Sequence, residues 1–286
     1  MKRLRLQYDL RILCQVLAVS RSGYYAWVSR KPSTRAQENA RLEIAIKAAH
    51  ERTRRSYGPE RLHKELQTDG YAVGVCRIKQ LRNKLGLRCA QRRRFKATTT
   101  SDHNLSVAPN LLAQHFAAHR PNQVWVTDIT YIPTDEGWLY LAGIKDLYTR
   151  QLVGYAMGER MTQALVAQAL FQAVAIQRPP AGLVHHSDRG SQYCSPMYQR
   201  ILAQFGMTAS MSRRGNCYDN APMESISGTL KTELIHRRRY STRQCAQQEI
   251  TEYIEMFYHR QRRHSRLGYL SPAAYAQQYY RTQQSA

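Results

Sequence analysis

The chain has 286 residues, 43% of them hydrophobic, and its 43 Lys and Arg against 20 Asp and Glu give a formal net charge of +23. This length and apolar content allow a buried core, which excludes an intrinsically disordered protein. No apolar run approaches the roughly 20 residues that a membrane-spanning helix needs, and the N-terminus does not resemble a secretory signal. We therefore expect a cytoplasmic globular protein that does not bind membranes.

The charge is distributed unevenly along the chain. Residues 1–120 contain 25 Lys and Arg against 8 Asp and Glu, residues 121–230 contain 8 of each, and residues 231–286 contain 10 against 4. The basic residues do not form one face of an amphipathic helix, which disfavours a membrane surface as the partner. The pattern predicts chemistry in a neutral centre and binding of a polyanion on both sides of it.

Helical patterns occupy the first part of the chain. Residues 35–54 carry apolar side chains at helical spacing. A second helix is expected to start at Pro59, which suits a first helical position, and to stop near Gly70. A third helix is expected between Gly74 and Gly86, so that the last two resemble a helix-turn-helix, although a basic helix is also typical of a solvated surface. The candidate DNA contacts on this third helix are Arg77, Lys79 and Arg82.

A linker is expected to follow, over residues 91–120. It opens with a basic cluster, continues through TTTSDHN and ends at Arg-Pro-Asn. Such a cluster contacts phosphates or serves only solubility, and the sequence does not separate the two. The candidate DNA contacts in this cluster are Arg92, Arg93 and Arg94.

From residue 121 the pattern changes to short strands. Three β-rich segments, QVWVTDITYIPT, WLYLAGIKDLYT and QLVGYAMG, are expected to form a meander. They precede a helix over 162–177 that is apolar almost all round and therefore buried. A strand in GLVHHSD, a helix near 195–205, a strand in MTASMS and a long helix from about 221 follow. This order predicts an α/β fold, a mixed sheet flanked by helices.

Three acidic residues in this region are candidates for chemistry. Asp128 lies inside the first strand, where a carboxylate is costly unless it is paired, hydrogen-bonded or bound to a cation. Asp188 ends a short apolar strand, and ligands of open α/β sheets collect at the carboxyl ends of strands. Glu224 lies near the start of the last helix, which Asp219 or Asn220 would cap and whose dipole favours a glutamate in any case. Each residue taken singly also has a structural explanation.

Together the three carboxylates match the needs of metal-dependent phosphoryl transfer. Mg²⁺ and Mn²⁺ take oxygen ligands, and two such ions about 3.5–4 Å apart can activate an attacking hydroxyl and stabilise a leaving oxygen. Lys231 follows Glu224 by almost two helical turns, which places a cation for a phosphate on the same helix face. We therefore predict that Asp128, Asp188 and Glu224 hold two divalent metal ions, Mg²⁺ or Mn²⁺.

The order and spacing of these residues resemble the DDE transposases and retroviral integrases. The strings HSDRGSQY, RRGNCYDNAPMES, GTLKTEL and RQRRHSRLGYLSPAAY are similar to the catalytic (OrfB) product of the IS-three family of insertion sequences. The resemblance covers about residues 20–275. It implies a ribonuclease-H-like fold, metal-dependent cleavage of DNA at the ends of the element, and strand transfer by a 3′ hydroxyl.

The resemblance also implies roles for single residues and partners. Asp128, Asp188 and Glu224 would be the catalytic triad, with Lys231 and His186 or Arg189 close to the DNA. The expected partners are DNA, further copies of the same chain, and an upstream-frame (OrfA) partner or fusion. The tail interleaves aromatic rings with cations, which either bind DNA or form the wet face of a helix. The remaining candidate DNA contacts are Arg213, Arg214, Arg262 and Arg263.

We therefore expect four regions and one function. The regions are a helical, helix-turn-helix-like DNA-binding part at 1–90, a basic linker at 91–120, a ribonuclease-H-like integrase catalytic core at 121–236 and a basic helical tail at 237–286. The expected function is that of a DDE transposase. Two alternatives stay open: a structure-selective metal-dependent nuclease, which would cleave without joining, and a non-catalytic DNA-binding regulator, which would tolerate loss of the carboxylates.

Overall fold

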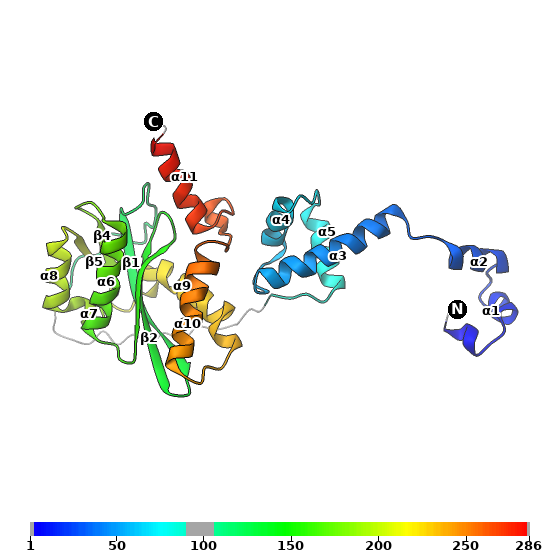
Figure 1. Ribbon diagram of the computed structural model, residues 1–286, viewed down its shortest axis with the longest axis horizontal. Coiled ribbons are helices and arrows are strands. Elements are labelled where there is room, and N and C mark those ends of the chain that lie inside the picture. The colour runs from blue at the N-terminus through cyan, green and yellow to red at the C-terminus, as the bar shows by residue number, and fades with distance from the viewer. Residues whose placement is uncertain (1–2, 90–105, 285–286) are drawn as a thin grey trace.

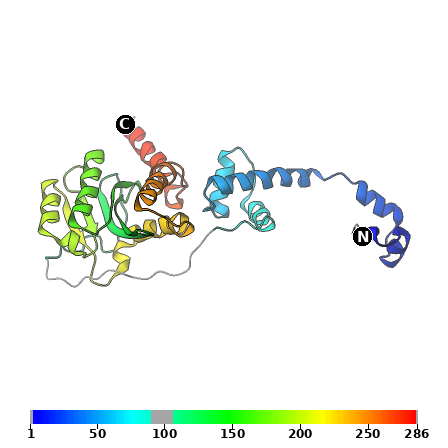
Figure 2. The ribbon, with the colours of Figure 1, turned by 60° about the horizontal axis from the view of Figure 1, so that its bottom comes forward.

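The computed structural model describes residues 3–89 and 106–284 of the chain. Within these ranges, no helix has both the length and the apolar character needed to cross a membrane. Two short helices, α1 (Leu10–Val16) and α2 (Arg21–Ser29), lie apart from the rest of the molecule in both views (Figures 1 and 2). Three of the predicted DNA contacts lie outside the described residues, namely Arg92, Arg93 and Arg94.

A three-helix unit follows, which we call the helical unit. It consists of α3 (Thr34–Arg52), α4 (Pro59–Thr68) and α5 (Val75–Lys84). Pro59 occupies the first turn of α4, and Gly70 beyond its end adopts a φ of +86°, a conformation that favours glycine. All three helices agree with the predicted ones to within two residues at each end. The side chains fully buried between them are Ile46, Leu62, Leu66 and Ile78.

A five-stranded mixed sheet forms the centre of the remaining chain, in the order β3-β2-β1-β4-β5. The antiparallel meander consists of β1 (Val124–Thr134), β2 (Gly137–Asp146) and β3 (Leu152–Gly158). On the other side of β1, β4 (Val184–Ser187) and β5 (Thr208–Met211) run parallel to it. The meander and the mixed sheet are confirmed, and the fold is the ribonuclease-H-like one.

Helices cover both faces of this sheet (Figures 1 and 2). One face carries α6 (Gln163–Gln177), α7 (Ser191–Cys194) and α8 (Pro196–Gln204). The other face carries α9 (Ala221–Glu233) and α10 (Arg243–Glu252), and its apolar core continues into the helical unit. Among the described residues, two apolar cores therefore lie on opposite faces of the sheet.

Side chains along β1 alternate between these two cores. Trp125 packs with α6, α7 and α8, whereas Val124 and Val126 pack on the side of α9 and α10. Because the side-chain period of a strand is two residues, Asp128 belongs to the α9 side.

The chain after α10 folds back on the sheet. A π-helical turn at Tyr253–Tyr258, which the sequence pattern did not predict, buries aromatic side chains in the core beside α9. His259 then accepts a hydrogen bond at Nε2 from the Leu152 backbone N–H (3.1 Å). This bond fastens the C-terminal part to β3 before the chain ends in α11 (Pro272–Gln284).

Candidate active site

Two aspartates occupy matching positions where two parallel strands pair, Asp128 within β1 and Asp188 directly after the last residue of β4. In the parallel pair of β1 and β4, Val126 lies opposite His186. Asp128 and Asp188 each come two residues later, so they stand at the same level of the sheet and on the α9 side of it. Adjacent strands are about 4.8 Å apart. The strand register therefore brings two carboxylates together at the carboxyl end of β4.

Backbone amides next to each aspartate orient its side chain. The Ile129 N–H donates to Asp128 Oδ1 at 2.8 Å, and the Gly190 N–H donates to Asp188 Oδ1 at 2.9 Å. A Cβ atom at Gly190 would lie only 3.0 Å from Asp188 Oδ1, so glycine preserves this tight turn. Both aspartates are thus placed by their immediate sequence neighbours.

Glu224 lies in the first turn of α9, and long-range contacts hold that turn on the sheet. Asn220 Nδ2 donates to the Thr127 carbonyl at 3.0 Å, and Lys145 Nζ donates to the Pro222 carbonyl at 3.0 Å. Thr127 directly precedes Asp128, and Pro222 lies two residues before Glu224. Neither role is apparent from local sequence patterns, because the partners are 93 and 77 residues apart.

Asn220 occupies the N-cap position of α9 as predicted, but the expected side-chain cap is absent, since neither Asn220 nor Asp219 makes a cap hydrogen bond. Asp219 is fully buried and accepts from the Arg213 guanidinium at 2.9 and 3.0 Å, from Gln114 Nε2 at 3.0 Å and from Asn110 Nδ2 at 2.9 Å. These donors, Arg213 above all, hold the pKa of Asp219 well below its usual range. The carboxylate joins the segment before β1 to the turn that leads into α9.

The charges at the site act on one another. Burial raises the pKa of Asp128 to about 8, and the carboxylates of Asp188 and Glu224 act in the same direction, against Lys231. Burial also raises the pKa of Glu224 and lowers that of Lys231, whose Nζ lies 4.4 Å from the centre of the Tyr131 ring. Repulsion between neighbouring carboxylates favours a proton or a bound cation.

The donor set at the site is made of carboxylate oxygens, which hard divalent cations prefer. In the part of the chain that the structure describes, no group of three His, Cys, Asp or Glu side chains is arranged to hold a metal ion. Glu224 instead lines a groove of about 770 Å³ between α9 and the helical unit. The residues therefore fit Mg²⁺ or Mn²⁺ in their chemistry, with the aspartate pair in place and Glu224 on the open side.

Two of the arginines predicted to contact DNA are buried and bind other residues of the protein instead. Arg262 is 5% exposed, and its guanidinium binds Glu233 at 2.8 Å. Arg82 is 7% exposed and donates to Cys89 Sγ. Neither guanidinium is presented to a DNA phosphate, so both residues have a structural role in this conformation.

His186 and Arg189 lie on either side of Asp188 and also make internal contacts. The His186 ring nitrogens contact Ser210 Oγ at 2.9 Å and Ser212 Oγ at 3.2 Å, and burial lowers its pKa to about 4. The ring is therefore neutral and links β4 to the chain at β5. Arg189 Nε donates to the Ser212 carbonyl at 2.7 Å.

The other predicted DNA contacts differ in exposure. Arg77 pairs with Glu38 of α3 at 3.0 Å, and Arg263 pairs with Glu65 of α4 at 2.6 Å. Lys79 and Arg214 are exposed, and the Arg213 side chain remains 56% exposed beside its buried partner. The structure therefore places Asp128 and Asp188 close together, with Glu224 and Lys231 near enough to act on the pKa of Asp128, but it scatters the predicted DNA contacts.

Comparison with protein families assigns two kinds of domain to the chain. The integrase core domain matches residues 118–217, a second integrase core domain model matches residues 205–272, and an HTH-like domain matches residues 36–95. The last match covers the helical unit. The expected helix-turn-helix-like region is therefore confirmed.

Relatives resemble the chain over almost its whole length. The 31 kDa protein of insertion element IS600 from Shigella sonnei is 60% identical and covers 94% of this chain and 98% of its own. Transposase InsF for insertion sequence IS3A from Escherichia coli strain K12 is 41% identical, over 93% of each chain. Among solved structures, the HTLV-2 integrase catalytic core domain in complex with magnesium matches 56% of this chain and 99% of its own, at 13% identity and a TM-score of 0.45. The chain belongs to the IS3 family of insertion-sequence transposases, enzymes of the DDE class.

Proposed function

We propose that Asp128, Asp188 and Glu224 hold two divalent metal ions and that the chain cleaves DNA at the ends of its insertion sequence and transfers the strands. The pairing of β1 with β4, which sets the two aspartates side by side, carries this proposal. The effect of the other carboxylates and of Lys231 on the pKa of Asp128 supports it. When bound, the ions supply the Lewis acidity that activates an attacking hydroxyl and stabilises a leaving oxygen.

The residues of the chain have distinct tasks in this reaction. Asp128 gives up a proton to become a ligand, since its pKa of about 8 keeps it protonated at neutral pH without a cation. Glu224 completes the ligand set from the first turn of α9. Lys231, on the same helix face, lies over the Tyr131 ring and is positioned to bind a phosphate oxygen of the DNA.

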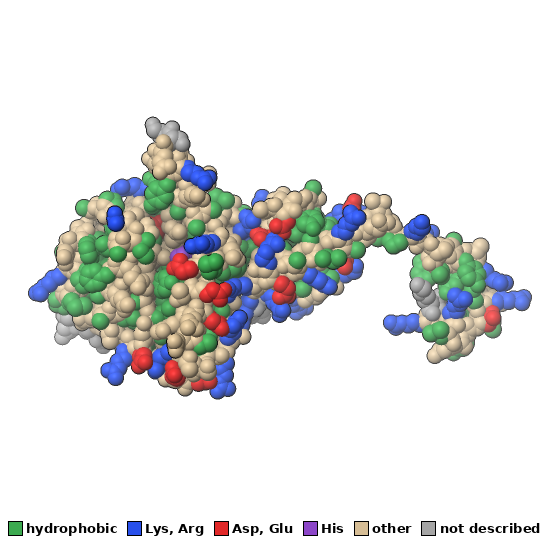
Figure 3. Space-filling model, in the orientation of Figure 1, with side chains coloured by type: hydrophobic (Ala, Val, Ile, Leu, Met, Phe, Trp, Pro, Cys, Tyr) green, Lys and Arg blue, Asp and Glu red, His purple; other side chains and the backbone are tan. Residues whose placement is uncertain are grey.

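We further propose that the exposed cations of the helical unit and of the loop before α9 contact DNA. Lys79 and Arg214 are the best placed, and Figure 3 shows Lys and Arg side chains distributed along the helical unit. Because these contacts are made to phosphates, the affinity for DNA should fall steeply as the salt concentration rises. We also propose that the protein works in the cytoplasm as a homo-oligomer on DNA, alone or with an upstream-frame OrfA partner.

The test is a joining assay with the full-length protein. The purified protein is incubated with Mn²⁺ or Mg²⁺, a labelled duplex carrying the DNA that flanks its own gene, and an unlabelled target duplex. We expect metal-dependent joined strands that disappear in Glu224→Gln. The matched control is Glu159→Gln, a glutamate just after β3 whose side chain is 70% exposed and lies outside the residues that line this groove, and it should leave joining unchanged.

Other products would favour one of the two alternatives. Cleaved but unjoined DNA would indicate a nuclease. DNA that is bound but chemically intact, even with an OrfA fusion, would indicate a non-catalytic regulator.

A further inference from the structure

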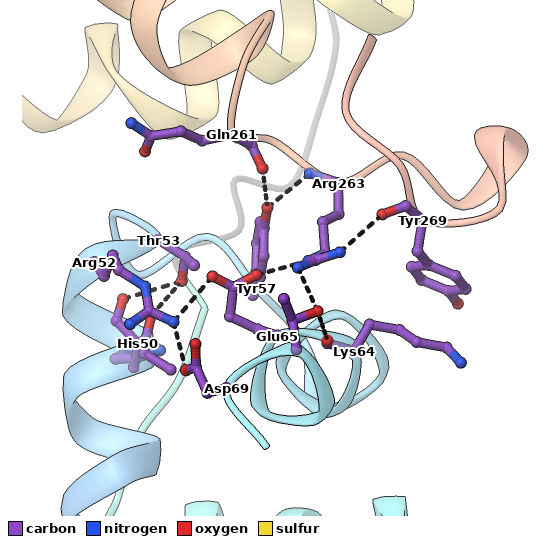
Figure 4. A network of polar contacts seen from close by, with 12 residues as sticks. His50, Arg52, Thr53, Tyr57, Lys64, Glu65, Asp69, Gln261, Arg263 and Tyr269 are labelled. Carbon is purple, nitrogen blue, oxygen red and sulfur yellow. Dashed lines mark hydrogen bonds and ion pairs between the residues drawn. The ribbon is translucent and has the colours of Figure 1, made fainter. Parts of the chain in front are cut away.

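The helical unit contacts the C-terminal segment around Gln261 and Arg263 (Figure 4). The residues that form these hydrogen bonds are separated by 195 to 206 positions in the sequence. Tyr57 is fully buried, and its hydroxyl accepts from the Arg263 N–H at 2.7 Å and donates to the Gln261 carbonyl at 3.2 Å. The Arg263 side chain donates to Glu65 at 2.6 Å and to Thr68 Oγ1 at 3.0 Å. Since the Arg263 and Glu65 side chains are only 19% and 16% exposed, this ion pair is screened little by solvent.

The loop before Tyr57 is held in an uncommon backbone conformation on the same contact surface. Arg54 and Arg55 both have a φ of +55°, in the left-handed region that residues with a side chain rarely adopt. The Arg54 guanidinium pairs with Glu252 at 2.7 Å and lies 5.2 Å from the centre of the Phe257 ring, and Arg237 donates to the Arg54 carbonyl. Strained conformations persist where surrounding contacts fix them, which indicates that this docking is specific.

The docking sets the helical unit across a groove from α9. The groove has a volume of about 770 Å³, and Glu224, Ser225, Thr229 and Thr232 line its α9 wall. The three hydroxyl residues recur at helical spacing, so they share one face of the helix. Arg61 lines the opposite wall. Hydroxyl groups and arginine are groups that bind DNA phosphates.

We propose that Tyr57, Glu65 and Arg263 form a clamp that fixes the helical unit to the C-terminal segment, so that the groove in front of Glu224 receives one strand of the DNA that the helical unit binds. The proposal rests on the proposed function, because it takes Glu224 as part of the catalytic site. Arg263 acts through the clamp and is a positioning residue, in place of the DNA contact that the sequence predicted.

A charge exchange in the full-length protein tests the clamp. Arg263→Glu sets two carboxylates against each other, and the double variant Glu65→Arg/Arg263→Glu restores an opposite pair. Arg52, which also pairs with Glu65 at 3.0 Å, keeps Asp69 as a partner at 2.7 Å in the double variant. Backbone hydrogen exchange of α4 reports the docking without any DNA. Cleavage of the duplex that flanks the gene, at saturating DNA with Mn²⁺, reports the groove.

We expect Arg263→Glu to speed exchange in α4 and to slow cleavage by roughly 10- to 100-fold, the scale of a misplaced substrate. Mn²⁺ affinity should stay unchanged, and the double variant should recover most of both losses. Tyr57→Phe should show a smaller effect of the same sign, because it removes only the hydroxyl. The control is Arg260→Glu, an exposed cation of the same segment with the same change in charge.

Each contrary outcome overturns a stated part of the proposal. Unchanged exchange in Arg263→Glu means that the clamp does not form in solution. Faster exchange with equal or faster cleavage means that the docked unit covers the site instead of guiding DNA. A double variant as slow as the single one, or an Arg260→Glu variant equally slow, assigns Arg263 to direct DNA binding. If the unsubstituted protein shows no cleavage, the proposed function fails, and hydrogen exchange still decides on the clamp.

Discussion

The aspartate pair and the glutamate are placed in the site by different means. Asp128 and Asp188 follow from the pairing of β1 with β4 and are oriented by adjacent amides. Glu224 depends on Asn220 and Lys145, two side chains that fasten the start of α9 to the sheet. A strand cannot slip by one residue without turning all its side chains to the other face, whereas a helix that packs on the sheet through its apolar side chains has no such register. The aspartates are therefore the rigid part of the site, and the glutamate is the adjustable part.

The largest effect is expected from a change to the rigid part. Asp188→Asn keeps the shape of the side chain but removes its charge, and strand transfer should fall on the order of 10³-fold or more. Joined product per unit time is the measurement, with far-ultraviolet circular dichroism to verify folding. Asp135→Asn, at a half-exposed aspartate on the β1–β2 turn, should keep full activity. Strand transfer that survives Asp188→Asn would remove this residue from the ligand set.

A smaller effect is expected from loosening the adjustable part. Lys145→Met keeps much of the side-chain volume but removes the bond to the Pro222 carbonyl, so Glu224 loses a constraint. We expect kcat to fall roughly 10- to 100-fold, with weaker Mn²⁺ binding. The free energy of unfolding should change little, because burial already lowers the pKa of this amine to about 7 and an apolar replacement avoids desolvating a charge. A loss of stability with normal kcat and Mn²⁺ affinity would make Lys145 purely structural.

The pH dependence of metal binding tests the rigid part of the site, because Asp128 must lose its proton to bind a cation. Without a cation Asp128 holds its proton up to about pH 8, and a bound cation must displace that proton. Mn²⁺ affinity should therefore rise with pH, by up to about tenfold per unit between pH 6 and 8, and level off above. Asp128→Asn should bind more weakly and lose this slope. Thermal unfolding with increasing Mn²⁺ measures it, and a flat response below pH 8 in the unsubstituted protein would contradict the raised pKa.

The smallest effect on catalysis is expected from a substitution on the face of the sheet that α6 covers, away from α9. A Cβ atom at Gly154 would lie 2.4 Å from the Ala169 carbonyl oxygen and 2.7 Å from Ala173 Cβ, so Gly154→Ala must push α6 away. The free energy of unfolding should drop by roughly 1–3 kcal/mol in urea titrations, with kcat per folded molecule unchanged. Gly74→Ala, where the added atom meets nothing within 4 Å, is the control. An equal loss of stability in both variants would place the strain elsewhere.

Much of the local architecture was predictable because it depends on neighbours in sequence. The start of α4 at Pro59 and the meander of β1 to β3 follow from turn residues and from the period of apolar side chains. The three carboxylates were found by their order and spacing, and the strand register agrees with the placement of Asp128 and Asp188. The side chain of Asp219 does not cap α9 because it finds a stronger partner in the Arg213 guanidinium than in a helix N–H.

The roles of individual cations did not follow from local patterns. Arg262 and Arg263 are adjacent in a basic, aromatic-rich tail that resembles a DNA-binding surface. In the folded protein Arg262 is buried against Glu233, 29 residues away, and Arg263 reaches Glu65, 198 residues away. An arginine acts on a phosphate or on a carboxylate according to which of them packing places within reach. Periodicity and turn chemistry thus define the elements, and the order and spacing of the carboxylates predict the triad. Packing between distant segments assigns Lys145, Asn220 and the arginines their partners.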